Sequence, residues 1–208
     1  MGKNGIESGN LEKAETCFIR IEDGGERLLR LINGLLDLAR LGSGKVNFNF
    51  VKNDMLACIH YVCNEMTATL EKKGVKVEVI QRNPVHILKF DKEHIIRVLV
   101  NILSNALKFS PEGAAITITL DYGRYTLNGK STKGLKVAVE DSGPGIAEGE
   151  TEFIFTKYMQ GSKTSTNHSG GSGVGLAICK EIILAHGGKI WSENRSEGGD
   201  MVSFIIPD

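Results

Sequence analysis

The chain has 208 residues, of which 41% are hydrophobic and 24% are charged, values that are usual for a soluble globular domain. A chain of this length can bury one large core and carry a short appendage. Its 25 basic and 25 acidic residues balance, which predicts no nucleic-acid partner and no contact with an anionic membrane, while its 25 glycines are an excess that needs a reason.

Apolar residues recur every seven positions near the start of the chain. The a positions of this heptad are Leu11, Phe18, Gly25, Ile32 and Ala39, and the d positions are Ala14, Ile21, Leu28 and Leu35. Further leucines widen the stripe, which favours a four-helix-bundle helix over residues 11–41. Residues 1–10 are expected to be disordered or to belong to an added tag. The alternative is an amphipathic helix packed on its own domain, because Gly24 and Gly25 each cost about 1 kcal/mol in a helix interior.

A Gly/Ser-rich segment after this helix marks a domain boundary. We expect a linker at residues 42–45 and one globular domain at residues 46–208. Periodicity in that domain predicts strand 45–51, helix 54–73, strands 75–80 and 85–90, helix 91–109, strands 115–122 and 135–140 around a polar loop 124–133, helix 174–186, and strands 189–193 and 202–206. These elements indicate an α/β (α+β) two-layer sandwich with helices on one face of a sheet.

Three polar residues share one face of the otherwise apolar helix 91–109. Asn101 and Asn105 are four residues apart, and Lys108 lies three residues further on. Amide oxygens are hard neutral ligands that suit Mg²⁺, and a lysine ammonium suits phosphate. The pattern favours a metal-nucleotide site, although a solvent-facing polar stripe has the same spacing.

Two glycine-rich segments stand where a ligand could approach the backbone. Asp141-Ser-Gly-Pro-Gly145 directly follows a predicted strand, and its carboxylate could accept a hydrogen bond from an adenine amine; a tight turn is the alternative. Gly170-Gly-Ser-Gly-Val-Gly175 opens the predicted helix 174–186, so its amides and the helix dipole predict a phosphate site. Its spacing differs from Gly-x-Gly-x-x-Gly, which argues against a dinucleotide-binding fold.

The cysteines predict reduced thiols and therefore a cytoplasmic protein. Cys17, Cys58, Cys63 and Cys179 form no Cys-x-x-Cys pair. His60 lies between two of them, but no fourth ligand stands at zinc spacing, which favours a packed helix. The most apolar stretch, residues 95–107, is too short and too interrupted to span a bilayer.

Four segments, taken in order, resemble the sequence boxes of the ATPase domain of sensor histidine kinases. Residues 101–111 resemble the N box, Asp141-Ser-Gly-Pro-Gly-Ile146 the G1 box, residues 154–158 the F box and residues 171–176 the G2 box. Residues 27–40 similarly resemble the second helix of that family's dimerisation bundle. The resemblance implies a Bergerat-type ATP-binding fold of the GHKL superfamily, preceded by one long dimerisation helix.

The same resemblance implies ATP and Mg²⁺ as cofactors and assigns the site. Asn105 would coordinate Mg²⁺ with support from Asn101, Lys108 would contact phosphate, and Asp141 would bind the adenine amine. The other residues that would line the nucleotide are Phe109, Gly143, Gly145, Ile146, Lys157, Gly171, Gly173, Val174, Gly175 and Leu176. Residues 156–172 would form an ATP lid.

A protein histidine kinase fragment is the enzyme that the resemblance implies. It would transfer the γ-phosphoryl group of Mg-ATP to a histidine, for relay to a response regulator. No histidine of the chain opens the family's phosphoacceptor pattern, so the acceptor is expected outside this fragment; the five are His60, His86, His94, His168 and His186. The implied partners are ATP or ADP, the phosphoacceptor helix of a homodimeric parent and a receiver domain. Anchoring of the parent in the inner membrane is left open.

Two departures and two competing functions accompany the resemblance. Tyr158 replaces the second phenylalanine of the F box, and Met201 stands where a threonine often approaches the adenine. ATP hydrolases of the gyrase and heat-shock chaperone type share the fold. They need a glutamate base four residues before the metal asparagine, where this chain has Asn101. A nucleotide-binding module without enzymatic activity is the third hypothesis.

Overall fold

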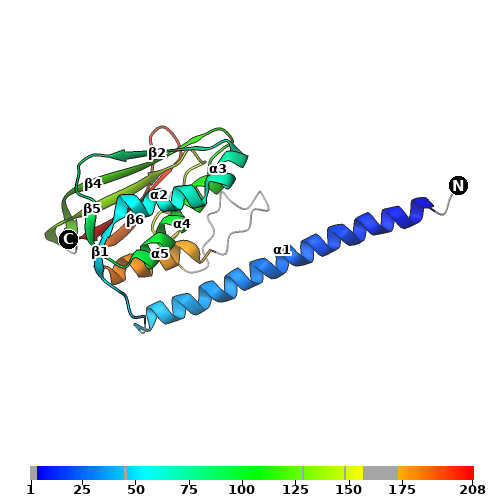
Figure 1. The fold of residues 1–208 in the computed structure, drawn as a ribbon, viewed down its shortest axis with the longest axis horizontal. Helices are drawn as coiled ribbons and strands as arrows, with labels where there is room; N and C mark the ends of the chain where they lie inside the picture. Colours follow the sequence, from blue (N-terminus) through cyan, green and yellow to red (C-terminus); the bar gives the residue numbers. More distant parts are fainter. Residues whose placement is uncertain (1–3, 45, 128, 148, 157–172) are drawn as a thin grey trace.

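A long helix, α1, extends away from a globular domain (Figure 1). In this computed structural model, residues 4–44, 46–127, 129–147, 149–156 and 173–208 are described. Helix α1 spans Asn4–Gly42. The helix therefore includes residues 4–10, for which the sequence analysis expects disorder or an added tag. Among the described helices, none has both the length and the apolar character needed to cross a membrane.

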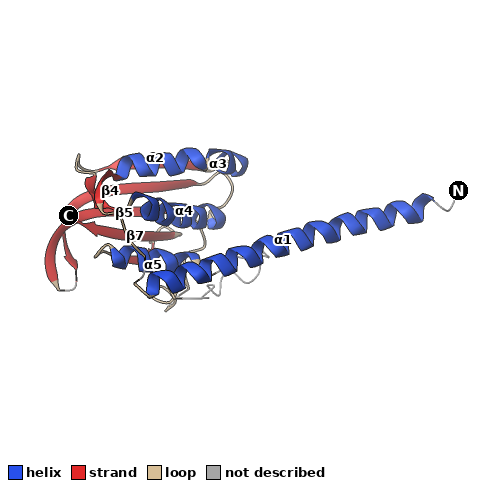
Figure 2. Ribbon diagram, turned by 60° about the horizontal axis from the view of Figure 1, so that its bottom comes forward, coloured by secondary structure: helices blue, strands red, loops and turns tan. Residues whose placement is uncertain are grey.

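The globular domain has two layers, a sheet and the helices that cover one of its faces (Figure 2). The five-stranded sheet has the order β2-β4-β5-β7-β6, antiparallel except between β2 and β4. Its strands are β2 (Lys76–Gln81), β4 (Ala115–Leu127), β5 (Lys130–Glu140), β7 (Asp200–Pro207) and β6 (Lys189–Asn194). A separate pair joins β1 (Val51–Asp54) to β3 (Ile87–Phe90).

The helices of the domain confirm the predicted sandwich, with one difference. They are α2 (Met55–Glu65), α3 (Thr67–Lys73), α4 (Lys92–Phe109) and α5 (Gly175–Ala185). The single helix predicted over residues 54–73 is therefore two helices, divided at Met66, whose backbone angles of −93° and 1° are not helical. Asp54 and Asp91 cap α2 and α4 through their side chains.

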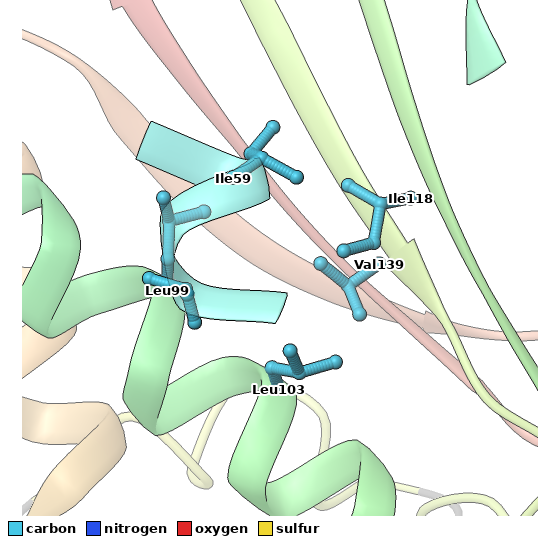
Figure 3. Close-up of a pocket in the computed structure, with 6 residues that line it drawn as sticks. Ile59, Leu99, Leu103, Ile118 and Val139 are labelled. Carbon is cyan, nitrogen blue, oxygen red and sulfur yellow. The ribbon is translucent and has the colours of Figure 1, made fainter. Parts of the chain in front are cut away.

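Alternation along the central strands builds the core between the two layers. Side chains from α2, α4, β4 and β5 meet there, and Figure 3 labels Ile59, Leu99, Leu103, Ile118 and Val139. The gap that these apolar side chains leave has no room for a water molecule. This region is therefore packed core and has no space for a ligand.

The β4–β5 hairpin is longer than the sequence analysis predicts. Pairing continues to Leu127 and Lys130, so the polar loop predicted over residues 124–133 is strand except at its tip. Gly129 adopts a φ of 76°, which a tight hairpin turn requires. The sequence predicts a hairpin loop here, and the dipeptide Asn128-Gly129 could have located its tight turn, but the polarity of residues 124–133 indicated a longer loop.

The strand predicted over residues 45–51 begins only at Val51. The residues before it contact helix ends instead of a neighbouring strand. The Asn49 N–H donates to Asp91 Oδ2 over 2.7 Å. The Phe48 ring centroid lies 4.5 Å from that of His94 and 5.4 Å from that of His186.

The C-terminal part of α1 packs on the domain. Leu38 is buried, and a Cβ atom on Gly34 would lie only 3.0 Å from Val174 Cγ1. Asp37 also forms an ion pair with Arg97 of α4. Apolar residues at other heptad positions of α1 are exposed: Phe18, Ile21, Leu28, Ile32 and Leu35. Helix α1 thus has one side on its own domain and an uncovered apolar seam.

Candidate functional site

Helices α4 and α5 run antiparallel and bring two predicted segments together. At one end of the pair, the Asp91 N–H donates to His186 Nε2 over 3.0 Å. At the other end, a Cβ atom on Gly175 would lie 3.0 Å from Asn101 Oδ1. The start of α5 therefore lies directly against the polar face of α4.

The first turn of α5 has an apolar N-cap residue and follows a glycine with a positive φ. Its N-cap residue, Val174, has no polar side chain with which to satisfy the amide groups of this turn. Gly173 enters the helix with a φ of 66°, a conformation that favours glycine. The amide groups and the helix dipole at this end of α5 favour a negative charge. Leu176 completes this turn, whereas Gly171 lies outside the described residues.

The polar face of α4 supplies the second part of the site. Asn101, Asn105 and Lys108 are half-buried, while their neighbours Ile102, Leu103, Ala106 and Leu107 fill the core. Lys108 Nζ lies 4.8 Å from the centroid of the Phe109 ring. The stripe offers neutral amide oxygens beside an ammonium group, a set of donors that fits Mg²⁺ with phosphate.

The C-terminal end of α4 lies against the segment that begins at Asp141. A Cβ atom on Gly143 would lie 3.1 Å from the carbonyl oxygen of Phe109. From α3, Lys73 Nζ donates to the carbonyl groups of Leu107 at 2.6 Å and Lys108 at 3.0 Å. The end of α4 is thus fixed on both sides.

Asp141 is a buried carboxylate directly after β5. It continues the row of core-facing side chains that ends with Val139, and 7% of its surface is exposed. Its Oδ1 accepts from the N–H of Gly143 at 2.7 Å and of Asp200 at 3.3 Å. Burial raises the pKa of Asp141, opposed by these amides and by Arg195. No described residue bonds to its Oδ2, which is therefore available to a donor on a ligand.

Two residues that the sequence analysis missed hold the loop after Asp141. Asn194, at the end of β6, donates to the Ile146 carbonyl at 2.8 Å and accepts from the Ile146 N–H at 2.7 Å. A Cβ atom on Gly145, whose φ is 69°, would lie 2.8 Å from Asn194 Oδ1. Arg195 donates to the Asp141 carbonyl at 2.9 Å. No local pattern marks these residues, because their role depends on strand order.

The start of β7 places Asp200 beside Asp141. Met201, which the resemblance puts where a threonine often approaches the adenine, alternates with Asp200 and therefore belongs to the other face of the sheet. Phe155 of the F box is buried. Lys157 and the predicted lid from residue 157 onward lie outside the described residues.

Gly199→Ala should destabilise the domain more than Gly198→Ala. Both glycines have a positive φ, of 88° and 92°, which costs alanine about 1 kcal/mol. A Cβ atom at position 198 meets open space, whereas at position 199 it would lie 2.0 Å from the Asp141 carbonyl oxygen. We expect a total loss of about 2 kcal/mol for Gly199→Ala, measured by urea unfolding. Equal losses would show that the backbone yields there without strain.

A two-layer sandwich that gathers a helix start, a stripe of amide and ammonium groups and a buried carboxylate at one end of its sheet defines a nucleotide-binding domain. The family model described as "Histidine kinase-, DNA gyrase B-, and HSP90-like ATPase" matches residues 90–208. The chain belongs to this family of ATPases.

Relatives narrow the family to histidine kinases. The chain is 34% identical over 200 residues to Sensor histidine kinase WalK of Bacillus subtilis (strain 168), covering 95% of the chain and 31% of that protein. A nucleotide-free catalytic domain of histidine kinase ThkA matches with 31% identity and a TM-score of 0.64, over 77% of this chain and 96% of that one. The chain is therefore a histidine kinase ATPase domain, and it spans about a third or less of the curated relatives' length.

Two further solved structures contain a domain of this fold. ThkA in complex with the response regulator protein TrrA matches with 27% identity and a TM-score of 0.69, over 90% of this chain and 49% of that chain. Full-length ShkA in complex with AMPPNP shares the fold, with a TM-score of 0.74 at 24% identity, over 93% of this chain and 38% of that one.

Proposed function

We propose that this chain binds Mg-ATP and transfers the γ-phosphoryl group to a histidine that lies outside its sequence. The observation that carries the proposal is the geometry of Asp141, whose Oδ1 is held by two amides while its Oδ2 is left for a ligand donor. An adenine amine is such a donor. The start of α5, where the side chain of Val174 supplies no capping hydrogen bond, and the stripe on α4 then take the phosphates.

Each predicted site residue has a role in this proposal. The amide oxygen of Asn105, supported by Asn101, would hold Mg²⁺, and the ion when bound would neutralise phosphate charge. Lys108 contacts phosphate as a point charge. Gly143 and Gly145 let the backbone approach the base, and Gly173 and Gly175 let it approach the phosphates. The remaining proposed nucleotide contacts come from Phe109, Ile146, Lys157, Gly171, Val174 and Leu176.

Transfer to a supplied nucleophile fits the site better than hydrolysis of ATP. A hydrolase needs a base to activate water, and a glutamate four residues before the metal asparagine provides it in the gyrase and chaperone types. Here that position is Asn101, whose amide cannot take a proton. Positioning and charge neutralisation are then the protein's share of the reaction.

The proposed partners follow from α1 and from the relatives. The exposed apolar seam of α1 needs a cover, which the acceptor helix and a second subunit of a homodimeric parent would supply in a bundle. A receiver domain of a response regulator would accept the phosphoryl group next, as the ThkA–TrrA complex suggests by analogy. The domain would work in the cytoplasm, with residues 11–41 as the bundle helix, residues 42–45 as the linker and residues 46–208 as the ATPase domain.

The chain should bind Mg-ATP and Mg-ADP with a measurable heat at millimolar nucleotide or below. Isothermal titration with and without Mg²⁺ tests both cofactors, since Asn101 and Asn105 have no charge with which to bind the ion tightly without phosphate. Chelation of Mg²⁺ should weaken ATP binding. An absence of nucleotide binding at millimolar concentration with Mg²⁺ present would contradict the proposal.

A further inference from the structure

The register of β5 and β7 places a second carboxyl group opposite Asp141. The paired residues that enter the core are Leu135 with Ile206, Val137 with Phe204, and Val139 with Val202. Asp141 and Asp200 are the next positions in these two rows, and the Asp141 N–H donates to the Asp200 carbonyl at 2.9 Å. The carboxyl groups of Asp141 and Asp200 therefore lie side by side at the end of the core-facing rows of β5 and β7, on the face of the sheet that the helices cover.

The surroundings of the two carboxyl groups differ and decide which one carries a proton. Asp141 Oδ1 accepts from two amide groups, which favour its charged form. Asp200 Oδ1 is shielded from water and has no hydrogen-bond partner in the described part of the chain. Two charged carboxylates directly opposite each other would repel. Burial and the charge of Asp141 accordingly raise the pKa of Asp200 to about 7, although the Met201 amide lowers it.

Two further charged groups lie close to this pair. Arg195 donates to the Asp141 carbonyl, and its Nε lies 3.3 Å from Glu140 Oε2, so these two charges largely compensate each other. The Glu140 side chain also belongs to the other face of the sheet, because it alternates with Asp141. Asp141 is therefore the charge that controls the proton on Asp200.

We propose that Asp200 is a second base-recognition residue, which donates a hydrogen bond to the ring nitrogen beside the 6-amino group of adenine while Asp141 accepts from that amino group. The inference rests on the proposed nucleotide site and deepens it. Adenine presents a donor and an acceptor side by side on this edge, and a carboxylate beside a carboxylic acid presents the matching acceptor and donor. A 6-oxo purine presents the opposite order, so each of its groups would meet a like group.

The pH dependence of ATP binding to the full chain tests this role. If only protonated Asp200 binds the base, the competent fraction falls about tenfold between pH 6 and pH 8 around a pKa of about 7. The asparagine of Asp200→Asn donates at every pH. The Kd of the parent divided by that of the variant should therefore rise about tenfold over this range, and this ratio cancels the titration of the nucleotide itself.

A second variant and a stability measurement test whether the change in the Kd ratio comes from the titration of Asp200 and not from the asparagine side chain. Asp200→Thr offers a hydroxyl donor that does not titrate, and it should give the same change in the ratio. A carboxyl pKa raised by folding means that the parent is fully stabilised below the unfolded pKa of about 4 and loses stability as pH rises through about 7. Thermal unfolding of Asp200→Asn should lack this loss.

The outcomes separate this inference from the proposed function. A Kd ratio that stays constant from pH 6 to pH 8 for both variants overturns the role of Asp200 and leaves the nucleotide site in place. Failure of the parent to bind ATP even at pH 6 overturns the proposed function as well. At pH 6 the parent should also bind ATP at least tenfold more tightly than inosine triphosphate, and equal affinities would contradict the donor–acceptor order.

Discussion

Replacing Asp141 by asparagine should weaken ATP binding about a hundredfold and leave the fold intact. The amides of Gly143 and Asp200 both point at Oδ1, so the asparagine oxygen would turn toward them and its NH₂ group would face the base. Two donors, this NH₂ and the adenine amine, would then meet in a site shielded from water. A lost charged acceptor and an unsatisfied donor together cost about 3 kcal/mol, which is roughly a factor of one hundred in Kd.

Glu78→Gln is the control for this substitution. It makes the same change from acid to amide at an exposed residue of the edge strand β2, which alternates with the core-facing Val77 and Val79 and so lies on the other face of the sheet. Titration calorimetry should show unchanged ATP affinity for Glu78→Gln and weak affinity for Asp141→Asn, with similar thermal unfolding of both. The Asp141→Asn variant should also gain affinity for inosine triphosphate relative to ATP. ATP affinity equal to that of the parent would remove Asp141 from base recognition.

The chain should not phosphorylate itself on histidine, yet it should phosphorylate an added bundle that carries the parent's acceptor helix. Phosphoryl transfer needs a nucleophile in line with the γ-phosphate. The groups that would bind the metal and the phosphates lie on α4 and at the start of α5. His94 is also on α4, but it lies fourteen residues from Lys108, which is about 21 Å along the helix axis. His186 is held beside Asp91 at that same far end.

Incubation with labelled ATP and Mg²⁺, with and without the acceptor bundle, measures this transfer. Acid-labile phosphate should form only on the added bundle, and the Asn105→Ala variant should abolish it if Asn105 holds the metal. His60 is exposed on α2, and His168 lies outside the described residues, so each histidine of the isolated chain should be checked by mass spectrometry. Acid-labile phosphate on any of them would contradict the assignment of this chain as the catalytic part alone.

The sequence predicted the layers of the fold better than it predicted strand partners. Periodicity located the core of α4, and residue type alone identified Asn101, Asn105 and Asp141 as candidates. Asp200 and Asn194 were missed because each matters only through its register with a neighbouring strand, and register is a long-range property. No 3.6-residue or two-residue period reports which strand lies beside β5.

Local sequence patterns that resemble a different structure caused two further errors. The tip of the β4–β5 hairpin extends from the sheet, so its strands carry polar side chains that resemble a loop in sequence. The aromatic residues before β1 alternate like a strand, but Phe48 contacts histidines at the ends of α4 and α5 instead of a second sheet face. In both cases tertiary contacts, which a single window of sequence does not contain, decided the outcome.

The two hydrogen bonds from Lys73 to the end of α4 have an electrostatic consequence for the proposed nucleotide site. The last carbonyl groups of a helix together carry about half a negative charge, and α4 ends beside the place where phosphate would bind. Lys73 Nζ takes the carbonyls of Leu107 and Lys108, which offsets this negative pole before an anion arrives. An incoming phosphate would then meet the positive pole of α5 with less repulsion from α4. Helix α3, which contributes no residue to the predicted site, thereby helps to set the sign of the field inside it.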